Sequence, residues 1–483
     1  MLDKRQFYID GAWVDPASPH DHPVLDPSTE EQIAVISLGS QADTDRAVAA
    51  AKAVEHDFAQ TTKVERRALV EGILAQYEKR KDELAEAIRL EMGAPIDLAR
   101  NSQAPCLPWH AKGFLHAYED FEFLRPLGPH APTDRIQMDP IGVVGLITPW
   151  NWPINQIALK VLPALLAGCP MVLKPSEEAP LSGMLFAEFC HDAGVPKGVF
   201  NLVNGDGKGV GTQLSTHPDI QMISFTGSAR AGREISRNAA DTLKRVTLEL
   251  GGKGANIIFA DADEKAVKRG VLHCMQNTGQ SCNAPTRMLV ERKVYDETVE
   301  KVKAVAESVT VGDPRQPGRH LGPVINRTQW DKIQRLIQTG IDEGARLLVG
   351  GPGLPEGMNR GYYVRPTVFV DVSNDMTIAR EEIFGPVLSV IPFEDEEEAI
   401  AIANDTPYGL TNYVQSQDGA KRNRVALRLK SGMVEMNGQD RAMGSPFGGV
   451  GMSGRAREGG VWGIEEFLEP KAISGWDPEA GMG

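Results

Sequence analysis

The chain has 483 residues, more than a single hydrophobic core usually supports, so at least two packed units are expected. Hydrophobic residues make up 41% and charged residues 24% of the chain, a composition typical of globular proteins and not of disordered ones. The 51 Lys and Arg residues against 65 Asp and Glu residues give a net charge of -14, which would repel a phosphate backbone, so we expect no nucleic-acid partner.

The first strongly patterned segments lie near the N-terminus. Residues 1–15 mix charged and aromatic side chains without an apolar run of signal-peptide length, so we expect no secretion from them. Residues 8–13 predict a hairpin around an Asp-Gly turn. Residues 43–91 have the composition and spacing of helix. The most apolar stretch, residues 141–173, is interrupted by prolines and polar residues, which predicts buried core and no membrane span.

Beyond residue 140, short β-branched runs alternate with amphipathic segments, which is typical of parallel strands joined by crossover helices. The first series predicts strands over 141–147, 171–173, 199–203 and 221–225, and helices over 180–193, 209–216 and 229–243. A second series begins after residue 250, with strands over 255–259 and 286–290 around a helix over 263–277. The acidic run 395–398 predicts a helix start. The sequence therefore predicts two α/β units in series.

The cysteines indicate a reducing compartment. There are five, an odd number, and no two form a Cys-x-x-Cys pair; they are Cys106, Cys169, Cys190, Cys274 and Cys282. This pattern predicts reduced thiols in the cytoplasm and argues against a disulfide framework or a zinc site, so we expect no metal ion.

A Gly-x-Gly-x-x-Gly match at 449–454 is rejected as a dinucleotide-binding turn. That fingerprint is meaningful only after a strand and before a helix in a βαβ unit, and too little patterned chain follows here. We expect a flexible loop instead.

Two other segments suit phosphate and ribose better. The predicted strand 221–225 is followed by Thr226-Gly227-Ser228 and a helix, whose first N–H groups could face a pyrophosphate. The alternative is that Ser228 only caps its own helix.

The second segment follows the strand 171–173. Lys174 could hold ribose or phosphate oxygens, and Glu177 could accept hydrogen bonds from a ribose diol. Because the Glu177 carboxylate would repel a 2′-phosphate, this segment favours NAD over NADP. A turn with a helix cap at Ser176 is an equally good local interpretation.

One cysteine is a candidate nucleophile. Cys282 lies in a segment of small residues, 279–284, where a substrate could reach its thiol. Cys274, inside the helical pattern, is expected to lie in the core. Because a single cysteine is more often structural than catalytic, the hypothesis depends on its surroundings.

A glutamate and an asparagine supply such surroundings. Glu249 lies between two leucines at the end of an apolar strand, where desolvation should raise its pKa toward that of a general base near neutral pH. Neutralisation by Lys253 or Arg287 remains open. Asn151 is held between Pro149 and Pro153 as a rigid amide donor that could stabilise an oxyanion, although turn asparagines are common.

Taken together, seven motifs resemble those of the aldehyde dehydrogenases of the non-phosphorylating, non-CoA-acylating type, in family order over nearly the whole chain. They are Pro-Trp-Asn-Trp-Pro at 149–153, Lys-Pro-Ser-Glu at 174–177, Phe-Thr-Gly-Ser at 225–228, Leu-Glu-Leu-Gly-Gly-Lys at 248–253, Gly-Gln-Ser-Cys at 279–282, Glu-Glu-Ile-Phe-Gly-Pro at 381–386 and Pro-Phe-Gly-Gly at 446–449.

The resemblance implies an α/β fold with two Rossmann-like domains and a small β oligomerisation flap. The NAD-binding domain would comprise residues 1–120 and 140–248, the catalytic domain 249–452, and the oligomerisation segment 121–139 and 466–483. It also implies a homodimer or homotetramer.

The resemblance further implies oxidation of an aldehyde to its acid. Cys282 would attack the aldehyde, Asn151 and the Cys282 N–H would hold the oxyanion, NAD would accept the hydride, and Glu249 would activate the water that hydrolyses the thioester. Lys174 is counted with the catalytic group. The expected cofactor contacts are Trp150, Lys174, Ser176, Glu177, Gly227, Ser228, Leu250, Gly251, Glu382 and Phe384. Of these, the roles of Glu382 at the nicotinamide ribose and Phe384 at the nicotinamide come from the resemblance alone.

Three positions depart from the commonest family pattern and leave the substrate open: Trp152 stands where Phe is usual, Gly254 where Ser or Asn is usual, and Gly451 where Lys is frequent. An apolar substrate lining is expected from Trp109, Trp152, Met443 and Phe447, although each could equally be core packing. Three rival functions remain, of which a cysteine hydrolase is the poorest because it would leave the cofactor motifs unexplained. A CoA-acylating relative would typically lack Glu249, and a catalytically silent relative would be expected to lose Cys282 or Glu249.

Overall fold

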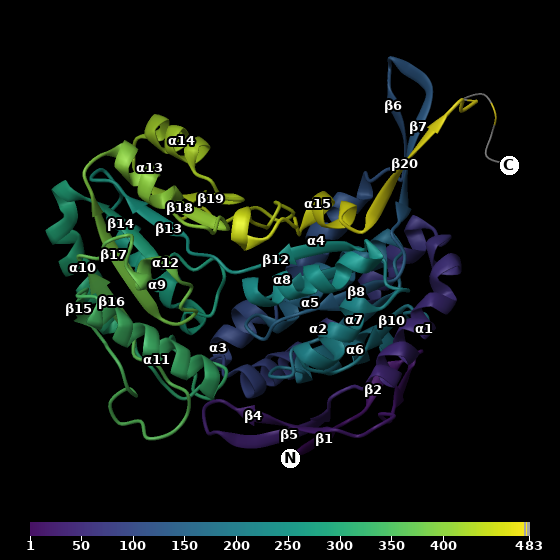
Figure 1. The fold of residues 1–483 in the computed structure, drawn as a ribbon, viewed down its shortest axis with the longest axis horizontal. Coiled ribbons are helices and arrows are strands. Elements are labelled where there is room, and N and C mark those ends of the chain that lie inside the picture. Colours follow the sequence, from purple (N-terminus) through teal and green to yellow (C-terminus); the bar gives the residue numbers. More distant parts are fainter. Residues whose placement is uncertain (478–479, 481–483) are drawn as a thin grey trace.

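Residues 1–477 and 480 are described by the computed structural model, in which two large sheets lie side by side, each with helices packed around it (Figure 1). The chain completes the first sheet at residue 249 and enters the second at residue 255. The prediction of two α/β units in series is therefore confirmed. Residues 250–254 form the crossing between the two units. Within the described residues, no helix is both long enough and apolar enough to cross a bilayer.

The first unit is built on a seven-stranded sheet. Its five central strands are parallel, and a hairpin adds two antiparallel strands at one edge. In sheet order the strands are β12 (Arg245–Glu249), β11 (Met222–Thr226), β8 (Val144–Ile147), β9 (Met171–Lys174), β10 (Phe200–Leu202), β2 (Phe7–Ile9) and β3 (Ala12–Val14). The predicted strands are confirmed with ends shifted by up to three residues. The predicted hairpin is also confirmed, and its turn residues Asp10 and Gly11 have φ of 52° and 78°.

Helices cover both faces of this sheet. The stretch predicted as helical over 43–91 is two helices, because Thr62 and Glu65 form a capping box that starts the second one. The helices are α1 (Gln41–Ala59), α2 (Lys63–Met92), α3 (Ile96–Leu98), α4 (Cys106–Glu119), α5 (Pro153–Ala167), α6 (Leu181–Asp192), α7 (Thr212–Thr216), α8 (Ala229–Ala239) and α15 (Gly460–Glu465), with π-helical turns at η1 (Ala99–Gln103) and η2 (Gly207–Gly211) and a 3-10 turn at η3 (Ala240–Thr242).

The second unit is built on another seven-stranded sheet, parallel except for one edge strand. In sheet order its strands are β15 (Arg346–Val349), β16 (Thr367–Val370), β17 (Val387–Phe393), β14 (Arg287–Glu291), β13 (Ala255–Ile258), β18 (Thr411–Gln415) and β19 (Met433–Met436). Its helices are α9 (Ala266–Met275), α10 (Tyr295–Ser308), α11 (Arg327–Asp342), α12 (Thr377–Arg380), α13 (Glu396–Asn404) and α14 (Gly419–Arg428), with 3-10 turns at η4 (Gln276–Gly279) and η5 (Arg292–Val294). The predicted helix start at 395–398 is confirmed, with Asp395 as the cap of α13.

Two small sheets complete the fold. One joins β1 (Leu2–Lys4), β5 (Glu31–Ser37) and β4 (Asp21–Asp26). The other is antiparallel, joins β20 (Leu468–Ser474), β7 (Ala131–Pro140) and β6 (Leu124–Gly128), and projects away from both units (Figure 1). These strands come from the two stretches expected to form an oligomerisation segment. Residues 478–479 and 481–483 of that expected segment lie outside the described residues.

Candidate active site

The start of α5 and the loop that carries Cys282 are joined by hydrogen bonds. The Asn151 side-chain amide donates to the Gln280 carbonyl at 3.0 Å, and the Asn277 amide donates to the Asn151 carbonyl at 2.8 Å. Asn151 is buried and is not a solvent-exposed turn residue. The structure therefore brings the predicted oxyanion donor to the predicted nucleophile loop, although the two are more than a hundred residues apart in sequence.

The backbone before Cys282 is held in an uncommon conformation. Asn277, Thr278 and Gly279 have φ of 53°, 57° and 71°, the left-handed region that costs free energy for residues other than glycine. A Cβ on Gly279 would lie 2.1 Å from the Gly385 carbonyl oxygen, so only glycine fits. The predicted helix over 263–277 ends at Met275 for this reason, and the loop then turns sharply toward the cysteine.

Cys282 is half-buried, whereas Cys274 lies fully buried in α9, as predicted. Desolvation raises the pKa of the Cys282 thiol to about 12, and the charges of Glu382 and Glu249 act in the same direction. Arg441 and the residue's own backbone N–H oppose this rise. The sulfur at rest is therefore a thiol, which must lose its proton before it can attack.

Glu249 ends β12 beside the same loop, and its side chain is only 2% exposed. Neither carboxyl oxygen has a hydrogen-bond partner among the described residues. Burial, reinforced by the charge of Glu458, raises the pKa of Glu249 well above its usual 4.5. Just after Glu249, a Cβ on Gly252 would lie 2.4 Å from the Cys282 carbonyl oxygen. A desolvated carboxyl that has no partner among the described residues, and whose charge acts on the Cys282 thiol, has the properties expected of a general base.

The sequence left open whether Lys253 or Arg287 neutralises Glu249, and neither does. The Lys253 ammonium is buried without a hydrogen-bond partner among the described residues, and burial lowers its pKa to about 7. Arg287 donates instead to the Lys253, Ile402 and Ala403 carbonyls at 2.9 to 3.0 Å.

A buried ion pair near Glu249 was missed by the sequence analysis. Lys160 on α5 and Glu458 lie 2.8 Å apart, both almost fully buried, and Lys160 also donates to Ser224 at 2.9 Å. Both charges influence the pKa of Glu249, in opposite directions. The only local sequence signal was a lysine inside an otherwise apolar helix pattern, since its partner lies 298 residues away.

Glu382 and Phe384 reach from the second unit toward the first. The Glu382 carboxylate accepts from the Gly252 N–H at 2.9 Å, and a Cβ on Gly251 would lie 2.2 Å from a Glu382 oxygen. The Phe384 ring packs edge-on against Trp150 at 6.2 Å. Both residues lie at the crossing between the units. The local sequence alone would have suggested a surface charge for Glu382 and a core aromatic for Phe384.

Lys174 and Glu177 lie at the carboxyl end of β9, the sheet edge predicted for them. The Lys174 ammonium donates to the Pro175 carbonyl at 3.0 Å, the Glu177 carboxylate at 3.2 Å and the Gly205 carbonyl at 2.5 Å. None of these bonds reaches Cys282, so the structure does not bring Lys174 to the thiol. Ser176 accepts from the Glu178 N–H at 3.3 Å in a turn and caps no helix, because α6 starts only at Leu181.

The turn after β11 is tied to the base strand. Gly227 donates its N–H to the Glu249 carbonyl at 3.0 Å. Ser228 is the N-cap of α8 and accepts from Ala231 at 3.3 Å, which is the capping interpretation left open above. Leu250 packs its side chain beneath α8, close to Gly232.

The glycine motif at 449–454 does not lie between a strand and a helix of a βαβ unit, as expected. It is, however, held in place by hydrogen bonds. It contains the 3-10 turn η6 (Gly451–Ser453). The Ser453 carbonyl accepts from the Leu250 N–H at 3.0 Å and the Ser453 hydroxyl donates to the Gly251 carbonyl at 2.7 Å. The segment therefore holds the chain that follows Glu249, and the expectation of a flexible loop is wrong.

The expected substrate lining is more polar than the sequence suggested. Trp109 and Met443 are each more than a third exposed, and Met443 lies against Gly113 of α4. The Phe447 ring lies 4.7 Å beneath the Arg441 guanidinium. The Trp152 indole N–H donates to the Ser281 hydroxyl at 2.8 Å. The expected apolar residues are thus accompanied by a cation and by hydrogen-bonding groups.

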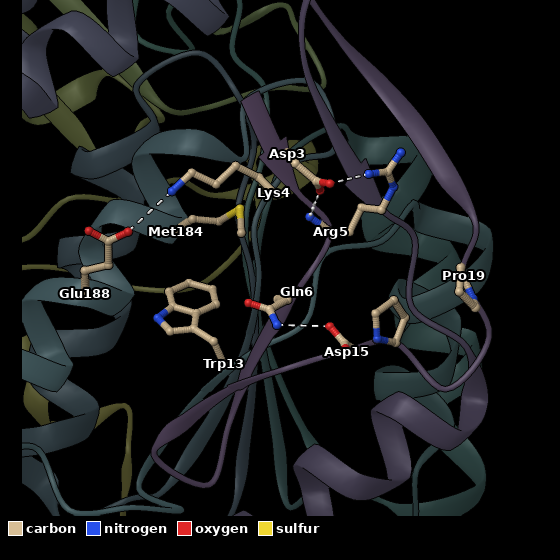
Figure 2. Close-up of a pocket in the computed structure, with 10 residues that line it drawn as sticks. Asp3, Lys4, Arg5, Gln6, Trp13, Asp15, Pro19, Met184 and Glu188 are labelled. Atoms are coloured by element: carbon tan, nitrogen blue, oxygen red, sulfur yellow. Dashed lines mark hydrogen bonds and ion pairs between the residues drawn. The ribbon is translucent and has the colours of Figure 1, made fainter. Parts of the chain in front are cut away.

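A surface hollow of about 620 Å³ lies elsewhere, at the N-terminal hairpin (Figure 2). Its lining includes Trp13 and Met184 and none of the predicted site residues. Its polar groups pair with one another, for example Lys4 with Glu188 at 3.5 Å and Gln6 with Asp15 at 3.0 Å. It therefore offers no comparable set of reactive groups. Within the described residues, no cluster of three or more His, Cys, Asp or Glu side chains could hold a metal ion.

Two α/β units that enclose a half-buried cysteine, an oriented amide and a desolvated carboxyl have the arrangement expected of an enzyme that acts on a carbonyl through sulfur. The aldehyde dehydrogenase family profile matches residues 13–473. A curated 3-succinoylsemialdehyde-pyridine dehydrogenase from Pseudomonas sp. is 49% identical over 479 residues, with 99% of this chain and 100% of that protein covered.

Solved structures agree. An aldehyde dehydrogenase from Bartonella henselae is 61% identical with a TM-score of 0.98, and the match covers 99% of this chain and 100% of that one. A cysteine-to-alanine variant of aldehyde dehydrogenase C from Pseudomonas syringae, in complex with NAD+ and octanal, is 48% identical with a TM-score of 0.96, covering 99% of this chain and 98% of that one.

The chain therefore belongs to the aldehyde dehydrogenase family. The expected α/β fold class and the expected activity, oxidation of aldehydes by an oxidoreductase, are confirmed.

Proposed function

We propose that this enzyme oxidises an aldehyde to its carboxylic acid with NAD, through a thioester on Cys282. The observation that carries the proposal is the convergence of Asn151, Glu249 and Cys282, from two different units, around one loop.

The residues divide the reaction between them. The half-buried Cys282 thiol gives its proton to solvent, and its sulfur forms a bond to the aldehyde carbon as the carbonyl π bond breaks. The Asn151 amide and the Cys282 N–H donate to the resulting oxyanion. After the hydride has departed, Glu249 takes a proton from water, whose oxygen displaces the sulfur and releases the acid. Glu249 suits this role because its unpaired oxygens are free to accept that proton.

The residues present fit a dinucleotide. Three buried polar atoms have no hydrogen-bond partner among the described residues: Thr148 Oγ1 and Trp150 Nε1 just after β8, and Thr226 Oγ1 at the end of β11. Trp150, Ser176, Gly227, Ser228, Leu250, Gly251, Glu382 and Phe384 would hold the cofactor, with Lys174 and Glu177 at its ribose; we assign Lys174 to binding and not to the chemical steps. When bound, NAD would accept the hydride.

We propose NAD over NADP because Glu177 places a carboxylate at the carboxyl edge of β9, paired with Lys174 at 3.2 Å. Glu177 is the more exposed member of this pair, so a 2′-phosphate would approach its negative charge before that of the buried lysine. Related structures described as complexes with NAD+ agree with this choice.

An assay with an aldehyde panel tests the proposal. NADH absorbance is followed with NAD and each aldehyde, with and without CoA, for the native enzyme and for Cys282→Ala. We expect NADH from the native enzyme without CoA and none from the variant. A requirement for CoA would favour the acylating rival, and no NADH from any aldehyde would favour a silent relative.

We also propose a homodimer or homotetramer assembled through the sheet of β6, β7 and β20, because a projecting sheet with unpaired edges invites pairing. A cytoplasmic location is proposed from the five cysteines, all of them free.

A further inference from the structure

Two neighbouring residues at the start of α5 hold two neighbouring residues just before the nucleophile. The Asn151 amide donates to the Gln280 carbonyl at 3.0 Å, and the Trp152 indole N–H donates to the Ser281 hydroxyl at 2.8 Å. Ser281 is the immediate neighbour of Cys282. We call these two hydrogen bonds the clamp.

The loop needs such support because its backbone is strained. Asn277 and Thr278 adopt left-handed conformations that persist only where surrounding contacts fix them. Asn277 is fixed by its bonds to Gln103 at 2.9 Å and to the Asn151 carbonyl at 2.8 Å. These contacts stop short of the cysteine itself. The bond from Trp152 extends the support to the residue next to it.

This bond depends on the indole N–H of Trp152. A phenylalanine at position 152 would keep an aromatic ring at the start of α5 but would have no donor for Ser281. The indole N–H is the only polar hydrogen of the Trp152 side chain, and it donates to this one acceptor. The second half of the clamp is therefore a property of the pair Trp152 and Ser281.

We infer that Trp152 is a positioning residue: its indole N–H, by holding the Ser281 hydroxyl, fixes the direction in which the Cys282 sulfur meets the carbonyl bound by Asn151. The inference rests on the proposed function, because it assigns Trp152 a part in the attack by Cys282. Trp152 touches the loop and not the reacting atoms, so its effect is on the rate of the first chemical phase.

A double-mutant cycle tests the clamp. Trp152→Phe, Ser281→Ala and the double variant are compared with the native enzyme in the pre-steady-state burst of NADH. A neutral hydrogen bond of this kind corresponds to a rate change of about fivefold, so each single variant should be about fivefold slower. The double variant should be no slower than either single one, because the same bond is lost only once.

A second measurement does not depend on turnover. A freed loop should expose the thiol, so iodoacetamide should alkylate Cys282 severalfold faster in both single variants, as measured on its peptide by mass spectrometry. Slower bursts together with faster alkylation are the signature of positioning; a general loss of folding would instead lower the melting temperature. Trp462→Phe, on the half-exposed Trp462 of α15, is the matched control and should change neither rate.

Native burst and alkylation rates in both single variants would overturn the inference. So would additive effects, with the double variant about 25-fold slower, since they would show no shared bond. If the native enzyme formed no NADH from any aldehyde while alkylation still followed the cycle, the proposed function would fall and the clamp would stand.

Discussion

Glu249 differs from Glu382 and Glu458, the other buried carboxylates around the site, because neither of its oxygens has a hydrogen-bond partner within the described part of the chain. Glu382 accepts from the Gly252 N–H, and Glu458 is paired with Lys160. A buried carboxyl without partners is unfavourable for stability, which indicates that function maintains it. This contrast is the basis for assigning the base role to Glu249 and not to its neighbours.

Replacement of Glu249 by glutamine should separate the two halves of the reaction. Because hydride departure does not need this carboxyl, Glu249→Gln should retain a burst of about one NADH per active site, whereas steady-state turnover should fall at least about a hundredfold. Stopped-flow absorbance measures both. Full steady-state activity near neutral pH would remove Glu249 from the base role.

The rate should rise with pH. Burial holds the pKa of Glu249 above its usual 4.5 and that of Cys282 at about 12. Hydrolysis of the thioester needs Glu249 without its proton, whereas the burst needs only the Cys282 thiolate, whose share increases as the pH rises because the thiol pKa is raised. The burst rate should therefore increase by up to about tenfold per pH unit on the alkaline side of neutrality. A burst rate that falls over the same range would contradict these assignments.

At this scale, sequence motifs predicted the central groups, Asn151, Glu249 and Cys282, because each is marked by its immediate neighbours. They could not predict Lys160 and Glu458, since the pair exists only after folding brings distant segments together. They also could not show that Trp152 donates a hydrogen bond to Ser281 in addition to presenting apolar surface.

At the scale of elements, one helix is capped from a distance. α6 begins after Pro180 and has no side-chain cap of its own. Glu91, at the end of α2, accepts from the Leu181 N–H and from the Ser182 N–H at 3.0 Å. This carboxyl thus ties two helices together beneath the first sheet.

Glu91→Ala should lower the free energy of unfolding by about 2 kcal/mol near pH 5.5, because two N–H groups lose their acceptor. Burial raises the pKa of Glu91 to about 7, above its usual 4.5. A carboxyl pKa raised on folding gives stability that is complete below about 4.5 and is lost as the pH rises from there to about 7, so the loss in the variant should be smaller at pH 8.

Urea denaturation at both pH values measures the effect. Glu78→Ala, on the exposed face of the same helix, is the matched control and should change stability by less than about 1 kcal/mol. Equal losses in both variants would mean that Glu91 does not cap α6.

The accuracy of prediction for elements depended on how local their signals are. The hairpin at Asp10 and Gly11 was predicted because its turn needs only two residues. The break between α1 and α2 was missed, although the capping box at Thr62 is also local. β16 and β18 are short, fully buried strands whose residues show no alternation. The sequence pattern therefore could not distinguish them from buried helix segments, and they were not predicted.

At the scale of the whole molecule, the sheet of β6, β7 and β20 stands apart from both units (Figure 1). Leu127 on β6 is 46% exposed there. If this sheet joins subunits, Leu127→Asp should shift native mass spectra from the larger assembly toward smaller species, because a charge would be buried at the contact. Leu427→Asp, at an 88% exposed position on α14, is the matched control and should leave the assembly unchanged. The same spectra for both variants would exclude this sheet as the contact.

The proposed mechanism requires an acyl group to form on one particular sulfur, that of Cys282. Glu249→Gln is mixed with NAD and an aldehyde, quenched in acid and digested, and the masses of the cysteine peptides are measured by mass spectrometry. The mechanism predicts a mass increase equal to the acyl group on the peptide that contains Cys282, and on none of the other cysteine peptides. Unmodified Cys282 in a sample that has released one NADH per active site would contradict it.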